Sequence, residues 1–81
     1  MRRNDGVEVR KTRIQKVVQT IVAALNQNKE AGWIQLDTTI ADIEYEEGLK
    51  KKRILEYAEI GEKRGLYVID VKNNQIRKTA S

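Results

Sequence analysis

Four consecutive cations, Lys50, Lys51, Lys52 and Arg53, follow the pair Gly48-Leu49 and open an apolar helical pattern. Cations at a helix N-terminus oppose the positive end of the helix dipole, at about 0.3–1 kcal/mol each. A chain that tolerates four of them in a row is expected to place this helix end beside an anion. Our leading hypothesis is the phosphate backbone of DNA, and the alternative is a solvated helix start whose long side chains cover the core.

The charges of the chain are segregated, although its net charge is only +4. Residues 1–18 carry six cations against two acids, and residues 26–47 carry six acids against Lys29. Residues 48–53 contribute four cations and no acid. The distribution of charge is a better indicator of binding partners than the net charge, and here it favours an anionic partner at several separate places. The alternative is a highly charged surface that only keeps the protein soluble.

The chain has few residues suited to catalysis or metal binding. The chain has neither cysteine nor histidine, which nearly excludes a zinc site and a histidine-based mechanism. Asp42 and Glu46 share a helix face and could reach one Mg²⁺ ion, but no lysine or histidine base accompanies them at motif spacing. We therefore expect no enzyme activity, no metal, no cofactor and no small-molecule ligand. We expect the acids, which include Asp37, Glu44 and Glu47, to hydrate a face turned away from DNA or to bind a basic partner.

No membrane segment is expected. The longest apolar run, residues 21–25, is far too short to span a bilayer, and the N-terminus lacks the apolar stretch of a signal peptide. We expect a soluble cytoplasmic protein, associated with the nucleoid if it is prokaryotic or viral.

The hydrophobic pattern predicts one small domain over residues 12–81, preceded by a basic arm over residues 1–11 that is flexible or forms a short strand. A first helix starts at Thr12, and a short strand covers residues 33–36. Asp37, Thr38 and Thr39 offer N-caps for a second helix that stops near Gly48. A third helix runs from Lys50 to Arg64, before the turn residue Gly65.

After Gly65 the pattern changes to a strand over residues 66–71 and a returning strand over residues 76–79. Asn73-Asn74 is expected to supply the two central positions of a tight hairpin turn. The order is helix, short strand, helix, helix and hairpin, which defines an α+β fold.

In this order the sequence resembles the small winged helix-turn-helix DNA-binding domains of bacterial, archaeal and viral regulators. The resemblance covers residues 12–79 and rests on Gly48-Leu49 at the turn into the recognition helix, on the core spacing of Ile54, Ala58 and Gly61, and on Gly65-Leu66 before the wing. It implies that the helix at 50–64 docks in the major groove and that the 66–79 hairpin lies on the backbone or in the minor groove. Lys50 departs from the usual Ser or Thr at the helix start. Glu56 and Glu59 stand where groups that read bases are usual, which puts sequence-specific reading in doubt.

The resemblance also suggests contacts outside this helix. The hairpin offers Lys72, Arg77 and Lys78, with Asn73 and Asn74 as weaker candidates, because the alternative for both asparagines is a role in the turn alone. Arg2, Arg3 and Arg10 are candidates for an arm in the minor groove, with a disordered charged terminus as the alternative.

Some apolar residues suggest contacts with another protein. Leu55 and Ile60 would do so if they are exposed, and a seam on the first helix with Ile14, Val22 and Leu25 would support a homodimer. The aromatic residues are expected in the core or at its rim: Trp33, Tyr45, Tyr57 and Tyr67.

Three functions follow as hypotheses. The first is a DNA-binding transcriptional regulator, acting as a homodimer on double-stranded DNA. The second is a sequence-tolerant architectural DNA binder. The third is a winged-helix module for protein–protein interaction, since a fold does not dictate a function.

Overall fold

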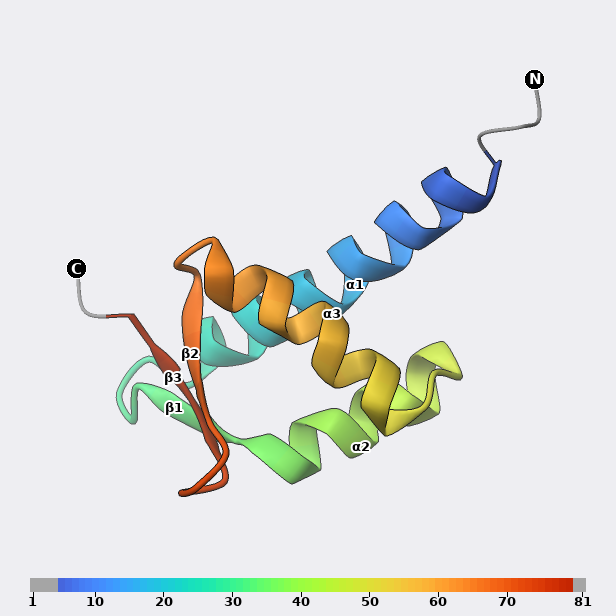
Figure 1. Ribbon diagram of the computed structural model, residues 1–81. Coiled ribbons are helices and arrows are strands. Elements are labelled where there is room, and N and C mark those ends of the chain that lie inside the picture. The colour runs from blue at the N-terminus through green and yellow to red at the C-terminus, as the bar shows by residue number, and fades with distance from the viewer. Residues whose placement is uncertain (1–4, 80–81) are drawn as a thin grey trace.

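A computed structural model describes residues 5–79 of the protein. Over this range the chain forms three helices and a three-stranded antiparallel sheet, so the predicted α+β class is confirmed and the arrangement is compatible with a winged helix (Figure 1). In chain order the elements are α1 (Asp5–Gln27), β1 (Trp33–Gln35), α2 (Leu36–Glu47), α3 (Lys51–Lys63), β2 (Tyr67–Asp70) and β3 (Gln75–Lys78).

The sheet has the order β1-β3-β2, so the short strand after α1 pairs with the last strand of the hairpin. Ile34 lies opposite Ile76, which in turn lies opposite Ile69. Ile34 and Ile76 are buried and Ile69 packs on the core, so this row faces the helices. Because side chains alternate along a strand, the adjacent row of Trp33, Arg77 and Val68 occupies the other face of the sheet.

The core lies where the three helices meet the inner face of the sheet. The stripe predicted for the first helix is correct, since Val17, Ile21 and Leu25 are buried. Each of the other elements adds at least one buried apolar side chain, and the largest fully buried ones are Tyr67, Ile21, Ile40, Ile43, Ile54, Ile76 and Val17.

One close contact joins α3 to β2. The Tyr67 hydroxyl donates a buried hydrogen bond of 2.6 Å to the carbonyl oxygen of Ala58. The ring therefore lies against Gly61, where an added Cβ would overlap the hydroxyl and come within 2.6 Å of the ring carbon Cζ. Gly61 is thus required by the tyrosine and not by its own backbone conformation.

Two helix starts differ from the predictions. The arm over residues 1–11 is wrong for residues 5–11, because α1 begins at Asp5, and residues 7–11 contain neither glycine nor proline to stop it. The N-terminal half of α1 projects beyond the rest of the domain (Figure 1). The second helix begins at Leu36, so Asp37, Thr38 and Thr39 lie inside its first turn and are not its N-cap.

The hairpin loop is longer than predicted. Asp70 pairs with Gln75, which leaves a four-residue loop, 71–74, where a two-residue Asn-Asn turn was expected. Within it the Asn74 N–H donates to the carbonyl oxygen of Val71 at 3.2 Å, and Asn74 has a φ of 55°; Asn73 does not have a positive φ. Loops of this length are commonly built around such a turn.

Several side chains are placed differently from the predictions. Tyr45 is 92% exposed, so its assignment to the core or its rim is wrong. Leu55 and Ile60 are half-buried and pack against the core, which removes them as freely exposed contacts. Leu25 is buried inside the domain and is not available for a dimer seam. Within residues 5–79, no helix combines the length and apolar character needed to cross a bilayer.

Candidate functional site

The N-terminus of α3 presents its positive dipole end together with the cationic run. Lys50 is the N-cap residue, in extended conformation, and within the described chain no side chain caps this helix. The first turn contains no Asp or Glu, and Lys51, Lys52 and Arg53 are all exposed. The helix end therefore adds to the positive field of the side chains, which makes it a favourable place for an anion.

The cations of the first turn point in three directions, because each residue advances about 100° round the helix. Lys52 lies opposite the core residue Ile54 and faces outward. Lys51 borders a depression of about 330 Å³ that it shares with the hairpin residue Val71. Arg53 faces α1. The cations therefore surround the start of α3 rather than forming a single row.

The outward face of α3 is mixed in charge. Counting from Lys52 at helical spacing, it carries Glu56, Glu59 and Lys63, all exposed. Glu56 lies 3.8 Å from the Nε atom of Arg53 and so is partly neutralised. The acidic middle predicted for this helix is thus on its accessible surface, with cations before and after it.

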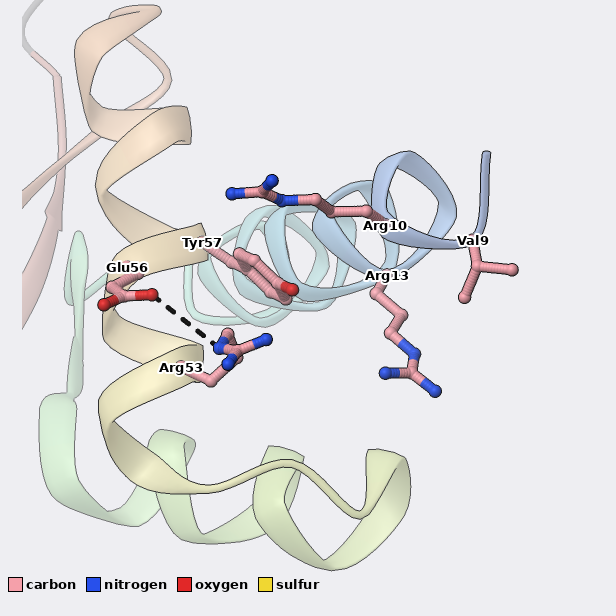
Figure 2. A pocket seen from close by; sticks show the side chains of 6 residues that line it. All are labelled: Val9, Arg10, Arg13, Arg53, Glu56 and Tyr57. Carbon is pink, nitrogen blue, oxygen red and sulfur yellow. Dashed lines mark ion pairs between the residues drawn. The ribbon is translucent and has the colours of Figure 1, made fainter. Parts of the chain in front are cut away.

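A cleft of about 430 Å³ separates the N-terminal half of α1 from α3 (Figure 2). Three arginines border it: Arg10 and Arg13 from α1, and Arg53 from α3. In the view of Figure 2, Arg10 and Arg53 lie on opposite sides of the Tyr57 ring. The remaining lining residues are Val9 and Glu56, so the cleft has three positive charges and one negative charge.

Tyr57 connects the core to this cleft. The residue is only 3% exposed, yet it lines the cleft. A hydrogen bond with the Tyr57 side chain, with a smaller contribution from the charge of Glu56, raises the pKa of the Arg53 guanidinium. The Arg53 side chain is 57% exposed and lies at the edge of the cleft.

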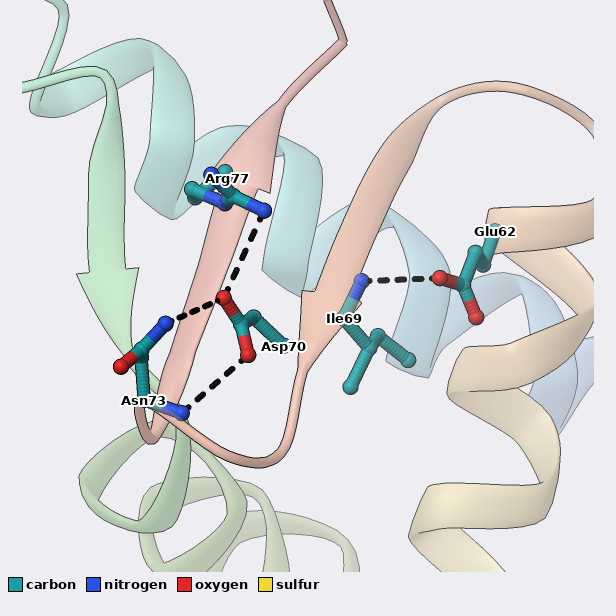
Figure 3. Close-up of polar contacts among 5 residues, drawn as sticks. All are labelled: Glu62, Ile69, Asp70, Asn73 and Arg77. Carbon is teal, nitrogen blue, oxygen red and sulfur yellow. Dashed lines mark hydrogen bonds and ion pairs between the residues drawn. The ribbon is translucent and has the colours of Figure 1, made fainter.

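The hairpin loop is organised by Asp70 (Figure 3). Its carboxylate accepts hydrogen bonds from the backbone N–H of Asn73 at 3.1 Å and from the Asn73 side-chain amide at 2.8 Å. Arg77 lies 3.4 Å from the same carboxylate. The bonds from Asn73, and to a lesser extent the charge of Arg77, lower the pKa of Asp70. Asn73 and Arg77 are thus engaged within the hairpin.

Asn74 is also used internally. Its side-chain oxygen accepts a hydrogen bond from the N–H of Asp37, and its carbonyl oxygen accepts one from the N–H of Leu36, both at 2.9 Å. These bonds give hydrogen-bond acceptors to the backbone N–H groups at the start of α2. Of the predicted hairpin contacts, Lys72 is exposed in the loop, and Lys78 lies at the far end of β3, where its N–H donates to Gly32.

The sequence prediction and the structure differ in which cations lie together. Arg10, predicted as part of an arm, lies on α1 and borders the same cleft as Arg53, whereas Arg2 and Arg3 lie outside the described residues. Arg13 and Tyr57 were not predicted as site residues. The spacing of Arg10 and Arg13, three residues apart, places them on one helix face, but this signal required the helix to begin before Thr12.

Comparisons with known proteins returned no match to a family model, to a curated protein or to a solved structure.

Proposed function

We propose that this protein is a winged helix-turn-helix DNA-binding protein that acts as a transcriptional regulator. In this proposal α3 enters the major groove of double-stranded DNA with its N-terminal turn. The β2–β3 hairpin is the wing and lies on the backbone or in the minor groove. The order of the helices and strands, and the pairing of β1 with β3, support this assignment of roles.

The observation that carries the proposal is that cations lie on both sides of the outward face of α3. Lys51 lies on the hairpin side, where it borders a depression with the loop residue Val71, and Arg53 lies on the α1 side, where it borders a cleft with Arg10. A major groove is about 12 Å wide and is bordered by a phosphate strand on each side. A helix flanked by cations on both sides matches that distribution of negative charge.

Phosphate contacts position a protein, and base contacts give it specificity. Glu56 and Glu59 occupy the part of α3 that would face the bases. A carboxylate accepts a hydrogen bond from the amino group of cytosine and is repelled by phosphates. A regulator of this kind would therefore favour cytosine at the contacted positions, and an architectural binder would show little preference.

A competition experiment tests the proposal and separates these two forms of it. The protein is bound to a genomic duplex at low salt and challenged with unrelated duplex. A regulator keeps one site with a preference of roughly 10³-fold or more, whereas an architectural binder is displaced by any duplex. Absence of duplex binding at low salt rejects both forms.

One observation favours a second candidate function, a protein-interaction module. Tyr45 is 92% exposed on α2, between the exposed acids Glu44 and Glu46. Tyrosine is enriched at protein interfaces, and the surrounding acids would suit a basic partner surface. If duplex binding is absent, a Tyr45→Ala variant tested for loss of partner binding becomes the decisive experiment.

The proposal also includes a homodimer and a cytoplasmic location. Two copies would place two α3 helices in successive major grooves, about 34–36 Å apart. Measurement of the solution mass, alone and with duplex, tests this. A cytoplasmic location, with nucleoid association in a prokaryote or virus, follows only if DNA is the partner.

A further inference from the structure

The cleft between α1 and α3 concentrates positive charge. Arg10, Arg13 and Arg53 border it, and among the side chains that the structure describes Glu56 is its single acidic lining residue. Arg13 also borders an adjacent cleft with Lys16 and Glu47, so the surroundings remain positive overall. Like charges that line one cleft repel one another. A bound anion would remove this repulsion.

The donors of the cleft suit an anion of a particular kind. A guanidinium presents up to five N–H donors in a planar fork that matches the oxygens of phosphate. Tyr57 also lines the cleft, and a phenol hydroxyl can donate a hydrogen bond to a phosphate oxygen. These donors line one cleft and come from two helices. In Figure 2 the Arg10 and Arg53 side chains lie on opposite sides of the Tyr57 ring and the Arg13 side chain points away from it, so the arginine side chains would turn toward a bound phosphate.

We propose that this cleft is a phosphate-binding site in which Arg10, Arg13, Arg53 and the Tyr57 hydroxyl bind one phosphate group. Its occupant in the complex is a backbone phosphate of DNA beside the groove that α3 enters, a step that rests on the proposed function. The site gives α1 a role in docking, since it fixes the position of the duplex relative to the projecting half of that helix.

The first experiment uses the protein alone and inorganic phosphate as the probe. NMR signals of the arginine side-chain Nε–H groups are followed while phosphate replaces chloride at constant ionic strength. The signals of Arg10, Arg13 and Arg53 are expected to shift together and to saturate in a range on the order of 10 mM, while those of Arg64 and Arg77 stay unchanged. A uniform or absent response of these five arginines overturns the proposal.

Variants separate a built site from a general positive surface. Tyr57→Phe keeps the buried ring, so the fold is expected to survive, and it removes one donor, which should weaken phosphate binding by roughly three- to tenfold. Thermal unfolding of the variant checks the fold. Unchanged phosphate affinity in a folded Tyr57→Phe protein shows that the hydroxyl does not contribute, and it contradicts the site as described.

The second experiment uses duplex DNA and the double variant Arg10→Gln with Arg13→Gln. The salt dependence of binding is expected to fall by about 0.9 log unit per log unit of salt, because one phosphate contact is lost. The control, Lys29→Gln with Arg64→Gln, removes the same charge just beyond the C-terminal ends of α1 and α3 and should leave the slope unchanged. Phosphate binding without DNA binding would reject the proposed function and keep the site. DNA binding with an unchanged slope in the arginine variant would reject the site and keep the function.

Discussion

The side-chain oxygen of Asn74, in the hairpin loop, accepts a hydrogen bond of 2.9 Å from the backbone N–H of Asp37, in the first turn of α2. A residue 37 positions away thereby supplies the cap that Gln35, the local N-cap residue of α2, does not supply through its side chain within the described chain. The stability of the second helix therefore depends on the hairpin loop.

Asn74→Ala is expected to lower the free energy of unfolding by about 1–2 kcal/mol, because it removes the cap and places alanine at a positive φ. Asn74→Asp keeps an oxygen acceptor beside the positive end of α2 and should stay within about 0.5 kcal/mol of the wild type. Denaturant unfolding measures both. Equal stability of the alanine variant and the wild type would show that this hydrogen bond does not contribute to the free energy of unfolding.

Gly61→Ala tests the contact between α3 and β2. In an exposed helix interior this substitution stabilises by about 1 kcal/mol, since alanine is the better helix former. Here the new Cβ meets the Tyr67 side chain, so we expect a loss of about 1–3 kcal/mol. Thermal or denaturant unfolding decides the sign, and a gain in stability would contradict the packing described here.

The alkaline limit of stability should depend on Tyr67. Burial, and to a lesser extent the charge of Glu62, raises the pKa of Tyr67 to about 12. In the unfolded chain a tyrosine has a pKa of about 10, so the folded state holds this proton more tightly. Its contribution is complete below pH 10 and is lost as the pH rises toward about 12. Unfolding free energies measured across this range should fall more steeply for the wild type than for Tyr67→Phe, and parallel curves would count against the assignment.

The acid limit should depend on the hairpin. Hydrogen bonds from Asn73 lower the pKa of Asp70, so its contribution is present above the ordinary aspartate pKa of about 3.9 and disappears as the pH falls through the lower folded value. An NMR titration of the Asp70 carboxyl carbon should show a low pKa in the wild type. In Asn73→Ala it should move toward the ordinary value. A titration unaffected by that substitution would mean that the loop is organised differently.

The parts of the fold that the sequence predicted are those set by local patterns. The helical spacing of Val17, Ile21 and Leu25 identified the buried face of α1, and Gly48 and Gly65 marked the helix ends. The sheet strands were found because their β-branched residues stand between turn residues. In each case a few neighbouring residues contain the whole signal.

The features that were missed depend on residues distant in the sequence. The cap of α2 comes from Asn74, which follows Asp37 by 37 positions. The cleft needs Arg13 on α1 to lie across from Tyr57 on α3, which depends on how the two helices cross. Periodicity identifies a helix face, but it does not show which side chain of another helix will lie opposite it.

The central claim, that the start of α3 docks on DNA phosphates, is tested most directly by the salt dependence of duplex binding. The double variant Lys51→Gln with Lys52→Gln is compared with the wild type and with the charge-matched control Lys29→Gln with Arg64→Gln. We expect weaker binding and a slope shallower by about 1.8 log units per log unit of salt in the Lys51 and Lys52 variant alone. The same affinity and slope in all three proteins would contradict the claim.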